Sequence, residues 1–268
     1  MAFFRASLVD QHTAEWQFEH FEFLIIELST GTGLSDAELQ LPHKDNFTDT
    51  NNPAAKYEGH DLAEFLLSRV QEQCGINIKI KLTPTRENKP VKLGSSAVMQ
   101  PLGKQDAAAG RYIVRQNNDG DIIEEITYDE DHMQDPAMLI GTFAHELSHC
   151  LHNRMKQIPE FEENILYEMF TDLTAVYLGY GVFLANGRSN STSNNEGWST
   201  NATGYLSESE LIFATALFMR IKNISIDTPQ PYLKPYLFKM LKKAMKQLGG
   251  YGNEIDFLRT LKPRSKTG

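Results

Sequence analysis

The sequence has few cysteines and no long apolar run, and its start is not expected to form a secretory leader. Only Cys74 and Cys150 occur among its 268 residues, too few for a disulfide framework. No apolar run approaches the ~18 residues that a membrane-spanning helix needs. The N-terminal stretch carries Arg5 but reaches Asp10 and His12 before an apolar region or a cleavage site can form. We therefore expect a cytoplasmic protein with no membrane partner.

The chain also lacks a dense basic surface. Its net charge is −9, whereas a protein that binds nucleic acid must neutralise many phosphates. One segment differs, because residues 231–268 hold nine Lys or Arg against two acidic residues. This basic tail is interpreted as a solvated helix face, with a docking surface for an acidic partner as the alternative. We expect no nucleic-acid partner, and the sequence is silent on oligomeric state.

The first half of the chain alternates between helical and strand-like patterns. Apolar residues recur at steps of three and four within residues 12–29 and predict an amphipathic helix, and a second helix is expected over residues 60–73. Residues 30–57 are rich in Gly, Asn, Asp and Pro and predict an irregular connection. Residues 76–83 are strand-like, and two more strand-like runs flank an Asp-Gly pair at 119–120, which indicates a hairpin.

The second half is predicted to be helical. Asp135 and Pro136 form an N-cap and first-turn pair before an apolar stripe of helical period. A second helix follows Pro159 and ends near Gly179 or Gly181. Residues 187–204 are dominated by Ser, Asn, Thr and Gly and predict a mobile loop. After this loop come a helix with a Ser-Glu capping box, to about residue 221, and a last helix over about 233–248.

The first of these helices carries an HExxH motif at His145, Glu146 and His149. Residues four apart on a helix differ by about 40° in azimuth, so both imidazoles can share one tetrahedral cation. Glu146 lies about 100° further round, where it can take a proton from a bound water without binding the metal. The pattern arises by chance in roughly one chain of this length per hundred, but chance matches need not fall on a predicted helix.

A catalytic zinc site needs a third protein ligand. Glu168 follows His149 by nineteen residues, and Asp172 lies one turn after Glu168 on the same predicted helix. Their spacing puts both carboxylates on one face, so Glu168 can bind zinc while Asp172 accepts the far N–H of a ligand histidine.

HExxH followed by ExxxD resembles the gluzincin metallopeptidases. In that family the glutamate is the third ligand and the aspartate orients the first histidine, which the resemblance carries to Glu168 and Asp172. Over its length, through LPHKDNF, ITYDEDHMQDPAMLIGTFAHELSH, GYGVFLAN and GYLSE, the chain resembles a group of bacterial zincin-like proteins. That group implies no substrate.

The oxyanion donor differs from the thermolysin-like pattern. Those enzymes use a histidine downstream of the motif, but all eight histidines of this chain lie at or before His152. Other gluzincins use a tyrosine, and Tyr205 lies just after the predicted mobile loop, at the start of a helix. Tyr177 and Tyr180 remain alternatives.

The remaining histidines and cysteines near the motif have structural interpretations. His152 is two turns from His145, so surface exposure is favoured over metal binding. Cys150 is interpreted as a small buried side chain. His60 and His132 are lone histidines, for which structural roles are the default.

These observations predict an α+β, zincin-like fold in a single catalytic domain covering residues 1–268. An N-terminal lobe with a small twisted sheet (about 1–134) is followed by two metal-binding helices (about 135–181) and a helical C-terminal lobe (about 182–268). The predicted function is a metallopeptidase with one Zn²⁺ per chain and a peptide or protein substrate. The alternatives are a zinc amidohydrolase acting on a non-protein amide and a non-catalytic zincin-like binding protein.

Overall fold

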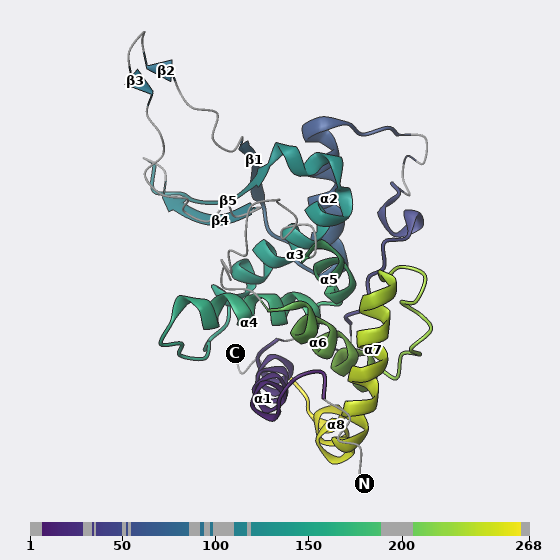
Figure 1. Cartoon of the computed structure of the whole chain (residues 1–268). Helices are drawn as coiled ribbons and strands as arrows, with labels where there is room; N and C mark the ends of the chain where they lie inside the picture. Colours follow the sequence, from purple (N-terminus) through teal and green to yellow (C-terminus); the bar gives the residue numbers. More distant parts are fainter. Residues whose placement is uncertain are drawn as a thin grey trace.

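The structure is a computed structural model that describes residues 7–28, 34, 36–49, 52, 55–85, 92–93, 97–98, 110–116, 119–188 and 206–263. Within these ranges the regular structure is mainly helical, with one small sheet (Figure 1). The α-helices are α1 (Gln11–Glu27), α2 (Gly59–Gln73), α3 (Pro136–His152), α4 (Asn164–Tyr177), α5 (Gly181–Arg188), α6 (Glu208–Ile221), α7 (Pro235–Gln247) and α8 (Gly252–Thr260). Short 3-10 turns occupy Lys44–Phe47, Glu130–Gln134 and Leu248–Gly250.

The sheet is mixed and three-stranded, in the order β1-β5-β4. Its strands are β1 (Ile80–Thr85), β4 (Gly110–Gln116) and β5 (Ile122–Asp129). β5 pairs in parallel with β1 and antiparallel with β4, so that Gly110 lies opposite Tyr128. A separate two-stranded ladder joins β2 (Lys92–Leu93) to β3 (Ala97–Val98). The predicted pairing of the strands on either side of the Asp-Gly turn is confirmed, whereas β1 begins later than predicted.

Helix boundaries follow the local signals where the sequence provides them. Asp135 caps α3 by accepting from the backbone N–H of Met138, with Pro136 in the first turn. Ser207 and Glu210 form the predicted capping box of α6. Gly75, at φ +66°, lies just beyond the end of α2 in the left-handed conformation that glycine adopts easily.

Two helices were not predicted. After α4, Gly179 at φ +102° redirects the chain, and Gly181 then begins α5 so close to Thr215 that a Cβ would lie 2.1 Å from its Oγ1. α5 extends to Arg188, so the prediction of a loop is wrong for residues 187 and 188, and residues 189–204 of that prediction lie outside the described residues. The helix predicted to be the last is followed by α8, whose N-terminus has no side-chain cap and therefore no clear sequence signal.

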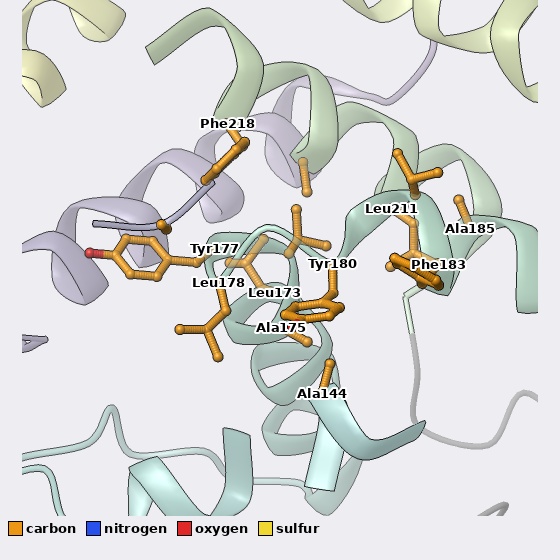
Figure 2. Packing of buried hydrophobic residues seen from close by; sticks show 14 of the residues in the cluster. Ala144, Leu173, Ala175, Tyr177, Leu178, Tyr180, Phe183, Ala185, Leu211 and Phe218 are labelled. Carbon is orange, nitrogen blue, oxygen red and sulfur yellow. The ribbon is translucent and has the colours of Figure 1, made fainter. Parts of the chain in front are cut away.

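The helices around α6 form the main core. α6 is buried on nearly all sides, and Figure 2 shows its Leu211 and Phe218 near side chains from α4 and α5, including Leu173, Tyr177 and Phe183. Each large apolar side chain buried in this way stabilises the fold by about 1.5–3 kcal/mol. Because α3 and α4 both pack into this core, side chains on their facing surfaces are held in fixed positions.

The predicted α+β class is confirmed, and the finer zincin-like assignment, the single domain and its lobe boundaries remain predictions. Among the described residues, no helix combines the length and apolar character needed to cross a membrane.

Candidate metal centre

The two motif histidines lie one above the other on α3. Their ring centroids are 4.9 Å apart, and His145 and Glu146 are both buried. The helix reaches this position because its N-cap fixes its start and its apolar stripe faces the core. The predicted geometry of the HExxH residues on one helix is therefore present.

Glu168 on α4 meets both imidazoles. Its Oε2 lies 3.1 Å from His145 Nε2 and 3.4 Å from His149 Nε2. One ligand atom from each of the three residues lies within 4.8 Å of the others. Two nitrogens and one carboxylate oxygen converging in this way form a group that could hold a metal ion, as predicted.

The far nitrogen of each imidazole is also held by α4. Asp172 accepts from Nδ1 of His145 at 2.9 Å with one carboxylate oxygen, and from the backbone N–H of Leu206 at 3.0 Å with the other. Asp172 is only 3% exposed, so these two bonds fix it. The predicted contact between Asp172 and a motif histidine is present.

Two residues that sequence reasoning missed lie beside the second histidine. Nδ1 of His149 is 3.4 Å from the Tyr167 hydroxyl and 3.5 Å from Thr171 Oγ1. Tyr167 immediately precedes Glu168, and Thr171 lies one turn beyond Tyr167, so helical spacing from the predicted third ligand could have identified both.

The electrostatics of this cluster favour positive charge. Burial lowers the pKa of His145, but hydrogen bonds to Asp172 and Glu168 outweigh burial and raise it to about 10. Burial likewise raises the pKa of Glu168, and its hydrogen bonds to His145 and His149 outweigh this and lower it to about 2. Carboxylates that hold a proton so firmly at an imidazole also favour a metal cation at the same place.

Glu146 lies between the metal-binding group and β4, at the edge of the sheet. Burial raises its pKa, opposed by the positive charges of His145 and His149 and by a backbone hydrogen bond from Tyr112. β4 comes this close because Gly110 has no side chain: a Cβ there would lie 2.7 Å from Thr142 Cγ2 and 3.2 Å from Glu146 Cγ. Glu146 is thus held between the metal-binding group and the backbone of β4.

A polar cluster joins the sheet to the end of α3. Tyr112 on β4 donates to Glu124 on β5 at 2.9 Å, and Arg154 forms an ion pair with the same carboxylate. Arg154 also donates to the backbone carbonyl of Cys150 at 2.8 Å. Cys150 is fully buried, as predicted. These contacts fix β4 relative to the helix that carries the motif.

Of the three tyrosines predicted as possible oxyanion donors, the structure describes Tyr177 and Tyr180, and both contact other parts of the core. Tyr205 lies outside the described residues. Tyr177 and Tyr180 are fully buried, and the hydroxyl of Tyr180 donates to Gln73 at 2.6 Å. The ring of Tyr177 packs on Phe21 of α1. Tyr205 therefore stays a prediction, whereas the geometry does not support the two alternatives.

The predicted surface exposure of His152 is wrong. Its side chain is 3% exposed and stacks on Phe170 with ring centroids 4.7 Å apart. Its Nε2 lies 2.9 Å from Thr174 Oγ1, and burial lowers its pKa to about 3. The reason is that α4 packs along α3 as far as its last turn, which the pattern of α3 alone does not reveal.

The lone histidines differ from each other. His60 stacks on Tyr128 and its Nδ1 lies 3.0 Å from that hydroxyl, so it joins α2 to the sheet. His132 lies in the short 3-10 turn before α3, and its Nδ1 is buried without a hydrogen-bond partner. Neither belongs to the metal-binding group.

No protein-family model matches this chain, and comparisons with the curated proteins and with the solved structures also give no match. The functional interpretation therefore depends on the residues and their geometry.

Proposed function

We propose that the chain is a zinc-dependent peptidase of zincin-like fold. His145, His149 and Glu168 hold the metal, Asp172 orients His145, and Glu146 is the general base. The observation that supports this proposal most strongly is the convergence of three ligand atoms within 4.8 Å, with a buried carboxylate on the next residue of the motif. Two imidazoles and one carboxylate form the donor set of catalytic zinc sites that keep one position open for water.

Bound by His145, His149 and Glu168, Zn²⁺ would supply a Lewis acid that lowers the pKa of water to about 7 and polarises a substrate carbonyl. Glu146 accepts the proton of the attacking water and returns it to the leaving amine. Its raised pKa suits this role, because a base whose conjugate acid is not too strong can both take and return a proton near neutral pH. The oxyanion donor is proposed to be Tyr205.

The sheet edge supports an extended peptide as substrate. β4 is one of the two edge strands of the three-stranded sheet, so one side of its backbone has no strand partner among the described residues. Tyr112 of this strand already reaches Glu146 with its backbone N–H. An extended peptide that pairs with the free side of β4 would lie along the metal centre. This arrangement favours a polypeptide over a small amide.

The first test is metal content, measured by elemental mass spectrometry on the native protein and on Glu146→Gln and His149→Ala. We expect about one zinc per chain in the native protein and in Glu146→Gln, and none in His149→Ala. His43→Ala is a matched control, because His43 is an exposed histidine outside the group and its loss should leave the zinc in place.

Peptide-library cleavage then tests the chemistry. We expect cleavage by the native protein and none by Glu146→Gln. Zinc in the native protein with no cleavage of any polypeptide would instead favour an amidohydrolase of another substrate. No zinc in any variant after incubation with the metal would overturn the proposal and favour a non-catalytic binding protein.

A further inference from the structure

α7 has two opposite faces. Its buried side chains, Leu237, Phe238, Leu241 and Ala244, pack into the core. The other side of the helix carries the lysine stripe, defined as Lys239, Lys242, Lys243 and Lys246, and all four are exposed. Steps of three and four residues align them along one line about 10 Å long. The sequence left open a docking surface within residues 231–268, and the structure places four of the lysines of that segment on one exposed face of α7.

The charge of the lysine stripe is directed to solvent. α7 contains no Asp or Glu, and none of the four lysines forms an ion pair with a described carboxylate. Lys242 lies 4.5 Å from the centre of the Phe238 ring, which leaves its charge intact. Some exposed cations elsewhere in the chain do pair, as Lys81 does with Glu125 at 3.1 Å. The stripe differs from such cations because its charge is uncompensated.

The negative net charge of the chain does not cancel this local charge. At physiological salt the screening length is about 8 Å, so a partner at the stripe is influenced mainly by nearby groups. Figure 1 places α7 on the flank of the molecule away from β4 and β5. A partner bound there would leave the edge strand and the metal centre accessible.

The chemistry of the stripe favours a phospholipid surface. All four cations are lysines, which act as point charges toward diffuse arrays of phosphate, whereas arginine is the residue that recognises carboxylates bidentately. Lysine is also depleted at protein interfaces. Four charges are few for nucleic acid, where affinity depends on many phosphate contacts. Tyr236 lies one turn before Lys239, is 40% exposed and donates its hydroxyl to Glu208 at 2.6 Å, and tyrosine is enriched at membrane–water interfaces.

We propose that the lysine stripe attaches this protein peripherally to anionic phospholipid membranes. The expectation of no membrane partner came from the absence of an apolar run, which excludes a spanning helix but does not bear on electrostatic attachment. The proposal is independent of the peptidase activity, since the stripe shares no residue with the metal centre.

The test is sedimentation of the full chain with phosphatidylcholine vesicles, with and without about one third phosphatidylglycerol. The variant replaces all four stripe lysines by Gln. Its matched control replaces Lys44, Lys56, Lys79 and Lys156 by Gln, which are exposed lysines scattered over other elements. Both variants have the same net charge, so they differ only in where the charge is lost. Thermal unfolding checks that both are folded.

We expect the native protein to bind the anionic vesicles at about 0.05 M salt and to be released at about 0.5 M, because salt shortens the screening length. Each lysine near such a surface contributes about fivefold to partitioning, so the stripe variant should lose at least tenfold and the control much less. Equal losses in the two variants, or no preference of the native protein for anionic vesicles, would overturn the proposal. Binding to polyglutamate without binding to vesicles would also overturn it and indicate an acidic protein partner.

Discussion

α3 is contacted by different kinds of structure on its two sides. On the α4 side, polar side chains hold both histidines: Asp172 bonds Nδ1 of His145, and Glu168 meets both Nε2 atoms. On the sheet side, the backbone of β4 approaches side chains of α3, because Gly110 leaves room for Thr142 and Glu146. The proposed metal ligands are therefore held by one neighbour and the proposed base by the other. Substitutions on the two sides should have separable effects.

The largest effect is expected on the α4 side, from Asp172→Asn. An amide has one oxygen where the carboxylate has two, so it cannot accept from both His145 and Leu206, and its NH₂ group would face a donor. We expect zinc affinity to fall by about 10 to 100-fold, as is typical when the partner of a ligand histidine is lost. Competition with a chromophoric chelator measures the affinity.

Glu163→Gln is the control for this substitution. Glu163 is an exposed carboxyl that immediately precedes α4, and its loss should leave zinc affinity unchanged. Equal affinity of Asp172→Asn and the native protein would show that the contact with His145 does not orient a metal ligand.

The matching experiment on the sheet side is Gly110→Ala. The added methyl would collide with Thr142 and Glu146, and overpacking of this kind costs about 1–3 kcal/mol. We expect turnover to fall by about tenfold, since the base is displaced from its position, while zinc content stays at one per chain. Peptide cleavage and elemental mass spectrometry on the same sample separate the two quantities.

Gly252→Ala provides the comparison, because nothing lies within 4 Å of a Cβ at Gly252. This variant should keep both turnover and zinc. Loss of zinc from Gly110→Ala would contradict the assignment of separate functions to the two sides of α3.

The part of the centre that the sequence predicted depends on spacing within one helix. His145 and His149 are four apart on α3, and Glu168 and Asp172 are four apart on α4, so each pair shares a face in any helix. The caps of α3 and α6 are likewise local, which is why their starts were predicted correctly.

The features that the sequence did not predict depend on contacts between elements. The approach of Gly110 to Glu146 joins residues 36 positions apart, and nothing near Gly110 in the sequence indicates it. His152 is buried by Phe170 and Thr174 of another helix. α5 begins at Gly181, which packs on Thr215 of α6, and no local sequence pattern reveals a contact between two helices so far apart in the chain. Local signals predict elements, whereas their packing decides which side chains become buried.

A third prediction concerns acid stability on the α4 side. Burial lowers the pKa of His152 to about 3 from its usual 6.5, so the folded state excludes a proton that the unfolded state binds. The stabilisation is complete above about pH 6.5 and is lost progressively as the pH falls toward 3. We expect His152 alone to lower the folding equilibrium constant at pH 5 by roughly 30-fold relative to pH 7.5, the ratio that follows from these two pKa values.

Urea unfolding of the metal-free protein at both pH values measures this effect. In His152→Gln the titrating group is gone, while an amide can still reach Thr174, so stability at pH 5 should rise relative to stability at pH 7.5. Burial also lowers the pKa of His20, which acts in the same direction as His152, whereas the raised pKa of His145 stabilises the folded state toward acid and acts in the opposite direction. An unchanged pH dependence in His152→Gln would show that His152 is not the group responsible.

The smallest effect on zinc affinity is expected from Tyr167→Phe. This variant compares the hydrogen bond that holds His149 with the one that holds His145. The Tyr167 hydroxyl is neutral and lies 3.4 Å from His149 Nδ1, whereas Asp172 is charged and lies 2.9 Å from His145 Nδ1. Thr171 Oγ1, at 3.5 Å, remains as an acceptor when the hydroxyl is removed. A neutral hydrogen bond contributes about 1 kcal/mol, so zinc affinity should fall by no more than about fivefold.

Adding Thr171→Val should increase the loss beyond that of Tyr167→Phe alone, because His149 then has neither acceptor. If Tyr167→Phe instead lowered zinc affinity as much as Asp172→Asn, the charge of Asp172 would add nothing to its hydrogen bond. The contacts of α4 with His145 and with His149 would then be equally important for zinc binding.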